Sequence, residues 1–166
     1  MTPISETQAL TSQPLVRRLA ELLLKKHLLL ATAESCTGGL ISAACTDLAG
    51  SSDWFERGFI SYANAAKTEM LGVDPELLAN HGAVSEEVAR AMALGALSRS
   101  RAQVALAVTG VAGPGGASVS KPVGMVCFGF AVAGEVFSST RHFEGDRTAV
   151  RAASVHYALE ALLSRL

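Results

Sequence analysis

The segment ESCTGG, residues 34–39, places two nucleophilic side chains, Ser35 and Cys36, shortly before two glycines. It follows a short apolar run and precedes a stretch of small residues, a pattern typical of the turn between a buried strand and a helix. The first N–H groups of a helix lack intrahelical partners, so such a turn can hold a nucleophile beside donors for a developing oxyanion. The alternative is that Ser35 or Thr37 caps the helix while the glycines permit tight packing, which is the commoner role of a serine turn considered alone.

A second segment, SYANAAK (61–67), contributes a candidate base. Lys67 is one of four lysines and stands among alanines in a predicted short helix. A neutral lysine can remove the proton of a serine hydroxyl if its environment lowers the pKa of the ammonium from about 10.4. A solvated lysine on an amphipathic helix is at least as good an interpretation of the sequence.

Tyr62 lies five residues before Lys67 and is one of two tyrosines. At the end of a strand its hydroxyl would either relay a proton or sit at the rim of a cavity while the ring packs, and these interpretations have equal weight.

Cys36 competes with Ser35 as the nucleophile, because a thiolate attacks more readily. Adjacent side chains in a strand or turn point in different directions, so only one of them can face a substrate.

Two glycine-containing segments are candidates for ligand binding. The run TGVAGPGG (109–116) follows a predicted strand but lacks the spacing of nucleotide-binding loops, so it indicates a flexible ligand loop at best. Residues 118–121 match the S-x-x-K motif, but the preceding glycines and Pro122 argue against the helix that this motif requires.

The segment GDR (145–147), with Arg151 one helical turn later, combines the start of a helix with one or two guanidinium groups. Free N–H groups and arginines suit a phosphate. The alternative, and the commoner fate of such residues, is that Asp146 caps the helix and Arg147 pairs with Glu144.

Composition narrows the function classes. The 166 residues include 14 Lys and Arg against 15 Asp and Glu, a net charge of −1 that argues against binding nucleic acid or an acidic membrane through basic clusters. A hydrophobic content of 49% excludes a disordered chain. The three cysteines form no CxxC pair and the four histidines show no ligand spacing, so we expect no metal, no cofactor and a reduced, cytoplasmic setting. The first ten residues lack the features of a secretory signal.

Apolar periodicity and capping residues define the elements that must position these side chains. Helices are predicted over 14–27, 37–48, 64–71, from 75, over 85–98 and from 145 onward, and strands over 28–34, 58–62, 103–109, 123–133 and 136–143. Pro14 and Asn64 are expected to open their helices. Ser85 is expected to cap the helix over 85–98, in which Gly95 indicates close packing. This order predicts an α/β fold, a single layered domain over residues 14–166 with a mixed β-sheet flanked by helices, after a flexible N-terminal segment 1–13.

Six motifs in order resemble one family. They are AESCTGG (33–39), GSSDWFERGFISYANAAK (50–67), GAVSEEVA (82–89), TGVAGPGG (109–116), KPVG (121–124) and FEGDRTAVR (143–151). These motifs identify the chain as similar to the CinA C-terminal-domain family over residues 15–166. The stand-alone members of this family are nicotinamide-nucleotide amidases. Ala117 and Met125 depart from the glycine and threonine expected from related sequences.

The resemblance implies an amidohydrolase that converts nicotinamide mononucleotide (NMN) to nicotinate mononucleotide and ammonia in pyridine nucleotide salvage, in the short form without the N-terminal domain of larger CinA proteins. The family's serine nucleophile falls on Ser35, its lysine base on Lys67 and its assisting tyrosine on Tyr62. N–H groups of the turn would hold the oxyanion through an acyl-enzyme reaction, while Arg147 and the glycine loop would hold the phosphate. The predicted substrate-binding residues are Cys36, Thr37, Gly38, Gly39, Thr109, Gly110, Ala112, Gly113 and Arg147.

Two other functions remain open at this point. One is a catalytically idle nucleotide-binding or regulatory module, and the other is an amidase for another small carboxamide. The apolar final helix and the low charge are compatible with a homo-oligomer, and equally with a monomer whose core buries the apolar side chains.

Overall fold

In the computed structural model, which describes residues 6–166, five strands form one mixed sheet in the order β2-β1-β3-β4-β5. β1 runs parallel to β2 and to β3, whereas β3, β4 and β5 pair antiparallel. The strands are β1 (Leu30–Glu34), β2 (Phe55–Ile60), β3 (Val104–Gly110), β4 (Met125–Val132) and β5 (Glu135–His142). The predicted α/β class, the mixed sheet and the final hairpin are confirmed.

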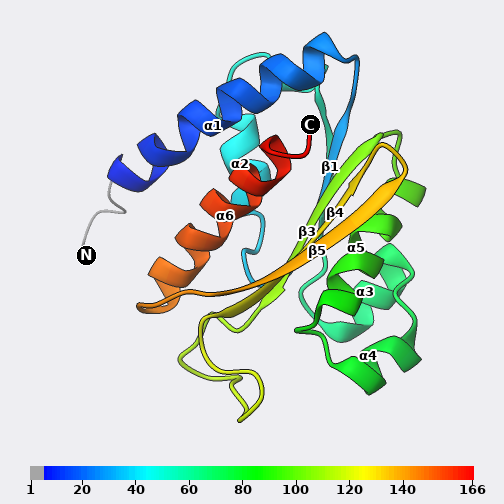
Figure 1. The fold of residues 1–166 in the computed structure, drawn as a ribbon, viewed down its shortest axis with the longest axis vertical. Helices are drawn as coiled ribbons and strands as arrows, with labels where there is room; N and C mark the ends of the chain where they lie inside the picture. Colours follow the sequence, from blue (N-terminus) through cyan, green and yellow to red (C-terminus); the bar gives the residue numbers. More distant parts are fainter. Residues whose placement is uncertain (1–5) are drawn as a thin grey trace.

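Helices cover both faces of the sheet, and Figure 1 shows the two layers on either side of it. One layer holds α1 (Glu6–Lys25), α2 (Leu40–Thr46) and α6 (Arg147–Leu163), and the other holds α3 (Asn64–Leu71), α4 (Pro75–His81) and α5 (Glu86–Ser98). A short 3₁₀ turn, Ser51–Asp53, precedes β2. No helix within residues 6–166 is long and apolar enough to cross a membrane.

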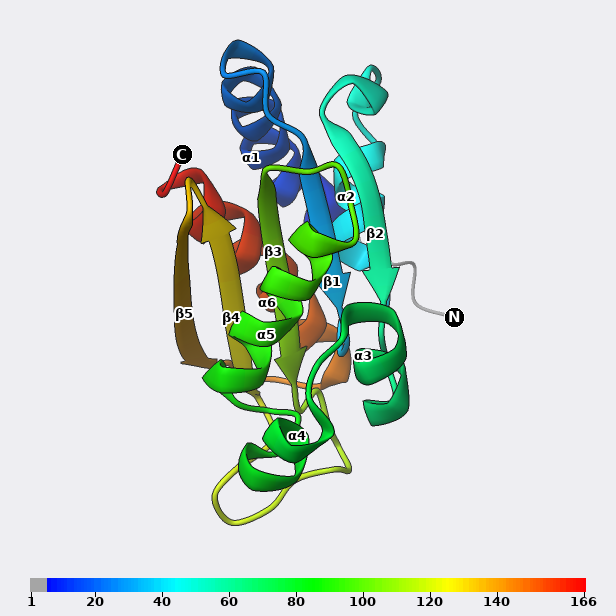
Figure 2. The ribbon, with the colours of Figure 1, turned by 90° about the vertical axis from the view of Figure 1, so that its right-hand side faces the viewer.

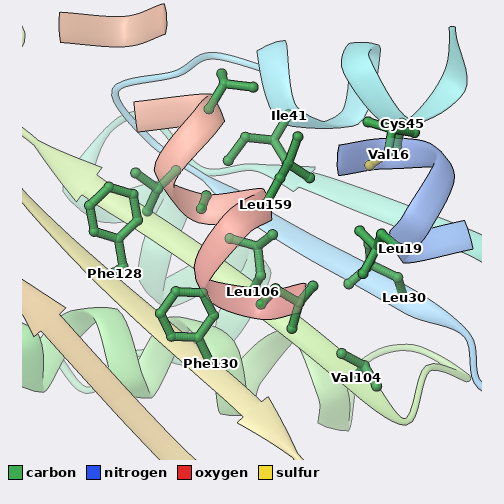
Figure 3. Packing of buried hydrophobic residues seen from close by; sticks show 14 of the residues in the cluster. Val16, Leu19, Leu30, Ile41, Cys45, Val104, Leu106, Phe128, Phe130 and Leu159 are labelled. Carbon is green, nitrogen blue, oxygen red and sulfur yellow. The ribbon is translucent and has the colours of Figure 1, made fainter. Parts of the chain in front are cut away.

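The two faces of the sheet carry side chains of different size. Large side chains such as Leu106, Phe128 and Phe130 face α6 and α1, where they form the core drawn in Figure 3. The opposite face is built mainly from alanines, and Gly129 lies against the backbone of α5. Small residues let the helix backbone approach the strands closely, and Gly95 serves the same purpose where α5 meets the Leu71 carbonyl, as the sequence predicted.

The N-terminal helix starts earlier than predicted. α1 begins at Glu6, and Pro14 lies inside it instead of opening it. Pro14 has no N–H to donate to the carbonyl four residues earlier. That carbonyl lies on the same helix face as Pro14, which is exposed, so it can bond water instead. Residues 1–5 of the segment predicted to be flexible lie outside the described residues.

Three predicted helix caps have different outcomes. Asn64 is the first residue of α3 and not its cap, because Ala63 occupies that position and no side chain caps the helix. The predicted caps of α5 and α6 are confirmed: Ser85 accepts a hydrogen bond from the Val88 N–H, and Asp146 accepts one from the Ala149 N–H.

The order of the strands creates a crevice at one end of the sheet. From β1 the chain moves outward to β2 and then returns past β1 to β3. Right-handed crossovers in opposite directions place α2 on one face and α3 to α5 on the other. Ligands of open α/β sheets bind where such connections diverge, outside the carboxyl ends of the strands. In Figure 2 this is the end where α3, α4 and the long loop after β3 lie.

Candidate active site

Ser35 and Lys67 meet at the carboxyl end of β1. The Ser35 N–H donates to the Val108 carbonyl at 3.0 Å, so Ser35 extends the strand pairing by one residue and faces away from its neighbour Glu34. Lys67 lies on the buried side of α3, four residues before Leu71, and its side chain is 1% exposed. Lys67 Nζ and Ser35 Oγ are 2.8 Å apart. The interpretation of Lys67 as a solvated surface lysine is therefore wrong.

The Lys67 amine has a defined hydrogen-bonding environment. Its Nζ also donates to the carbonyl oxygens of Ser61 at 2.9 Å and Tyr62 at 3.0 Å. Burial lowers the pKa of Lys67 below its ordinary value of 10.5. A neutral amine has two hydrogens and one lone pair. With both hydrogens on the two carbonyls, the lone pair remains for the Ser35 hydroxyl.

Glu34 holds the segment that follows it. Alternation along β1 points Glu34 toward α2, and its fully buried carboxylate accepts hydrogen bonds there from the Ile41 and Ser42 N–H groups at 2.8 and 3.0 Å. The Thr37 and Ser42 hydroxyls donate to it at 2.6 and 2.7 Å. Because the only Ser42 hydroxyl proton is used on Glu34, the Thr32 hydroxyl donates to Ser42 at 2.9 Å. Glu34 thus caps α2 from the neighbouring strand.

Sequence reasoning missed this role of Glu34. The sequence pattern predicted only that Glu34 ends an apolar strand. A charged residue at that place, shortly before the start of a helix, is the signal that could have indicated a capping role. Acidic groups near the first turn of a helix are favourable because the N–H groups and the helix dipole both attract them. The predicted caps, Ser35 and Thr37, do not cap α2.

The turn 35–39 differs in detail from the prediction. Its helix begins at Leu40 and not at Thr37, because Gly38 and Gly39 have φ angles of +56° and +105°, outside the helical region. The Gly38 N–H donates to the Ser35 carbonyl at 3.0 Å. Thr37, Gly38 and Gly39 do not line the cavity described below; they shape the turn that presents Ser35 and Cys36.

Cys36 points differently from Ser35, as predicted for neighbouring residues. Its side chain joins the apolar cluster on the α6 side and also touches the cavity wall. Burial raises the pKa of the Cys36 thiol to about 12, with a smaller contribution in the same direction from Glu34. The thiol is therefore protonated at neutral pH and is a weak nucleophile.

A cavity of about 250 Å³ lies above the Ser35 hydroxyl. The end of β2, the start of α3, the end of β3 and the glycine loop surround it. It brings together many of the residues that the sequence singled out, namely Ser35, Cys36, Tyr62, Lys67, Thr109, Gly110, Ala112, Gly113 and Arg147. Thr109 is buried and donates to the Ala83 carbonyl at 2.9 Å, which ties β3 to the segment before α5.

Tyr62 and Arg147 form the rim of this cavity. The Tyr62 side chain is 58% exposed, and its hydroxyl accepts a hydrogen bond from Arg147 at 3.0 Å. Arg147 also donates to the Gly113 carbonyl at 2.9 Å. Arg147 therefore does not pair with Glu144, the alternative considered for it. Its guanidinium links three segments at the cavity mouth.

Two other sequence candidates lie outside the cavity. Residues 118–121 form a turn, exposed at 118–120, in which the Ser118 and Lys121 backbones bond each other, so the S-x-x-K match is not helical. Arg151 donates to the carbonyls of Cys36 at 3.1 Å and Thr37 at 3.2 Å. Within residues 6–166, no three His, Cys, Asp or Glu side chains are grouped so that they would hold a metal ion.

Comparison with curated proteins gives close relatives. Over 132 residues, 79% of this chain and 80% of that protein, the chain is 55% identical to the nicotinamide-nucleotide amidohydrolase PncC of Escherichia coli (strain K12). It is 50% identical to the protein of the same name from Pseudomonas putida over 149 residues, 90% of this chain and 93% of that one.

Solved structures share the fold. The competence/damage inducible protein CihA from Agrobacterium tumefaciens superposes with a TM-score of 0.90 at 48% identity, covering 93% of this chain and 94% of that one. A CinA superfamily protein from Escherichia coli has a TM-score of 0.92 at 36% identity, covering 99% and 95%. The family model described as the CinA C-terminal domain matches residues 12–166. The chain belongs to the CinA C-terminal domain family.

Proposed function

We propose that this protein is a nicotinamide-nucleotide amidase, which hydrolyses the carboxamide of NMN to give nicotinate mononucleotide and ammonia. The observation that carries the proposal is the buried Lys67 amine, 2.8 Å from the Ser35 hydroxyl beside a cavity. The relatives named nicotinamide-nucleotide amidohydrolase support the choice of substrate. The free cysteines suit the reducing cytoplasm, where we place the reaction in pyridine nucleotide salvage.

In the first step Ser35 Oγ attacks the carboxamide carbon and neutral Lys67 takes the hydroxyl proton. The two carbonyls that hold the Lys67 hydrogens favour this direction, since they leave the lone pair toward Ser35 and stabilise the ammonium that forms. Protonated Lys67 then gives its proton to the departing nitrogen, the C–N bond breaks and ammonia leaves.

The tetrahedral intermediate needs donors for its oxyanion. The Gly38 N–H is bonded to the Ser35 carbonyl, which removes it from the candidates. The Cys36 N–H makes none of the hydrogen bonds found among the described residues, and Cys36 lines the cavity, so we assign the oxyanion to this N–H. One such donor contributes about 3 kcal/mol to stabilising the transition state.

In the second half Lys67 takes a proton from water as the water oxygen attacks the acyl-enzyme. The ester bond to Ser35 breaks, the proton returns to Ser35 Oγ, and the carboxylate product leaves. One base thus serves both halves of the reaction. Tyr62 contributes its backbone carbonyl to the base, and its hydroxyl assists at the rim of the cavity.

The phosphate of NMN is assigned to Arg147. This arginine lies between the cavity above Ser35 and an adjoining hollow of about 410 Å³ lined by Pro114, Val123 and the start of α6. Asp146 already accepts a hydrogen bond from the first turn of α6, so fewer free N–H groups remain there for an anion. The phosphate is therefore bound by the Arg147 guanidinium. The exposed Arg147 side chain is free to turn from the Tyr62 hydroxyl to a phosphate.

Ammonia release separates the proposal from its rivals. We expect release with NMN, far less with nicotinamide, and none with glutamine. An idle nucleotide-binding module would bind NMN in calorimetry without releasing ammonia. An amidase for another small carboxamide would treat NMN and nicotinamide alike, since it has no use for the nucleotide phosphate.

A further inference from the structure

Helix α6 presents two arginines, one turn apart, to different partners. Arg147 is exposed and contacts the cavity mouth, whereas Arg151 is half-buried and contacts the backbone of the turn that carries Ser35. Arg151 Nε donates to the Cys36 carbonyl and its Nη2 donates to the Thr37 carbonyl. Of the one or two guanidinium groups that the sequence offered to a phosphate, only that of Arg147 lies at the cavity mouth.

The two contacts of Arg151 fix the planes of two consecutive peptide groups. In a trans peptide the C=O and the N–H point in opposite directions. The Cys36 and Thr37 carbonyls both point to Arg151, so neither peptide group can rotate without breaking a hydrogen bond to this side chain. Because the guanidinium is charged, both hydrogen bonds are stronger than bonds between neutral groups.

We propose that Arg151 is a positioning residue of the amidase reaction, which holds the Cys36 and Thr37 carbonyls and so fixes the turn that presents the Ser35 hydroxyl and the Cys36 N–H to the cavity. The inference rests on the proposed function and deepens it. Glu34 holds the opposite side of the same turn through the Thr37 hydroxyl and the start of α2. The turn is thereby fixed from both sides, by a carboxylate on its N–H groups and by a guanidinium on its carbonyls.

Two substrates and two arginines test this role. The kinetic constants kcat and KM are measured with NMN and with nicotinamide riboside, which has the same cationic carboxamide but no phosphate. The variants are Arg151→Met, Arg151→Lys and Arg147→Met, with Arg18→Met on the exposed side of α1 as a matched control. Urea unfolding gives the folded fraction of each variant, so that rates are compared per folded protein.

A role in fixing the turn that carries Ser35 predicts a loss in kcat. Arg151→Met should lower kcat by about 10- to 100-fold with both substrates while KM stays within about threefold, which is less than the loss of a whole oxyanion donor. Arg151→Lys should be intermediate, since an ammonium keeps the charge but not the fork geometry. Arg147→Met should instead raise KM, and more for NMN than for the riboside.

Three results would overturn the inference. The first is a kcat of Arg151→Met, per folded protein, equal to that of the unmodified enzyme, which would leave Arg151 a structural brace. The second is a defect confined to KM for NMN, which would return Arg151 to the phosphate. The third is an unmodified protein that releases ammonia from neither substrate. That result removes the amidase function itself and is distinguishable, because it needs no variant.

Discussion

The turn 35–39 and the loop 111–124 both follow parallel strands, contain glycines and border one cavity, yet they are held very differently. In the turn, a buried carboxylate, a guanidinium and the start of α2 secure consecutive residues. The loop is joined at its base by two hydrogen bonds, from the Gly124 N–H to the Val111 carbonyl and from the Val111 N–H to the Met125 carbonyl, and residues 114–120 are exposed. Residues 114–117 take part in none of the hydrogen bonds found within residues 6–166.

The difference fits the separate tasks that we propose for the two regions, catalysis for the turn and substrate binding for the loop. A nucleophile and its oxyanion donors must stay within a few tenths of an ångström of their productive positions, because misplacement by about 1 Å costs about 100-fold in rate. A loop that surrounds the rest of a substrate has to yield as the ligand enters and leaves. Substitutions in the turn should therefore change kcat, whereas substitutions in the loop should change KM or nothing.

The largest effect is expected at the centre of the turn. Ser35→Ala removes the nucleophile, and Lys67→Arg replaces the base by a group that cannot lose its proton at working pH, so each should lower kcat by about 10⁴-fold or more. Cys36→Ala keeps the backbone N–H and should retain the rate within about tenfold. Ammonia release from NMN measures all three, and an active Ser35→Ala enzyme would exclude serine as the nucleophile.

Glu34→Gln should have the next largest effect. All four groups around the Glu34 carboxylate donate hydrogen bonds to it. A glutamine NH₂ group cannot accept a hydrogen bond, so at least one of these buried bonds is lost. We expect the free energy of unfolding to fall by about 1–3 kcal/mol and kcat to fall by about 10- to 100-fold. Urea unfolding and steady-state kinetics test this, with Glu69→Gln on the exposed side of α3 as the control. A stable, fully active Glu34→Gln protein would contradict the role of Glu34 in the turn.

The pH dependence of Lys67 gives a third test. Burial lowers its pKa from 10.5, so between the folded and unfolded pKa values the unfolded chain binds more protons than the folded one. Stability must then rise with pH in that window, by at most about 1.4 kcal/mol per pH unit for one proton. Lys67→Met lacks this proton, so the stability of the unmodified protein relative to Lys67→Met should increase from the folded pKa up to 10.5.

The same titration should appear in the kinetics. The base acts as a neutral amine, so kcat/KM for NMN should fall as the pH falls through the lowered pKa of Lys67. Urea unfolding at several pH values and a pH–rate profile are independent measurements of one group. A difference in stability between the two proteins that does not change with pH would contradict the lowered pKa.

The sequence predicted the architecture better than the local contacts. Alternating apolar runs and helix caps are local patterns, so the mixed sheet, the final hairpin and the caps Ser85 and Asp146 followed from them. The role of Glu34 did not, because it depends on β1 aiming a side chain at a helix start seven residues later. The separate tasks of Arg147 and Arg151 were also hidden, since only folding brings α6 against the turn and the rim.

The smallest effects should come from a matched pair of glycines, one in each region. Gly38→Ala in the turn forces a side chain into a φ of +56°, with a Cβ 3.4 Å from Arg151, and should cost about 1–2 kcal/mol of stability and lower kcat. Gly115→Ala in the loop meets nothing within 4 Å and needs no positive φ.

Gly115→Ala should therefore leave kcat unchanged and raise the free energy of unfolding by at most about 1 kcal/mol, because alanine restricts the unfolded chain. Thermal unfolding and kinetics with NMN compare the two variants directly. If both lowered kcat equally, the loop would be as strictly positioned as the turn, and the contrast between an anchored nucleophile and an adaptable binding loop would have no functional meaning.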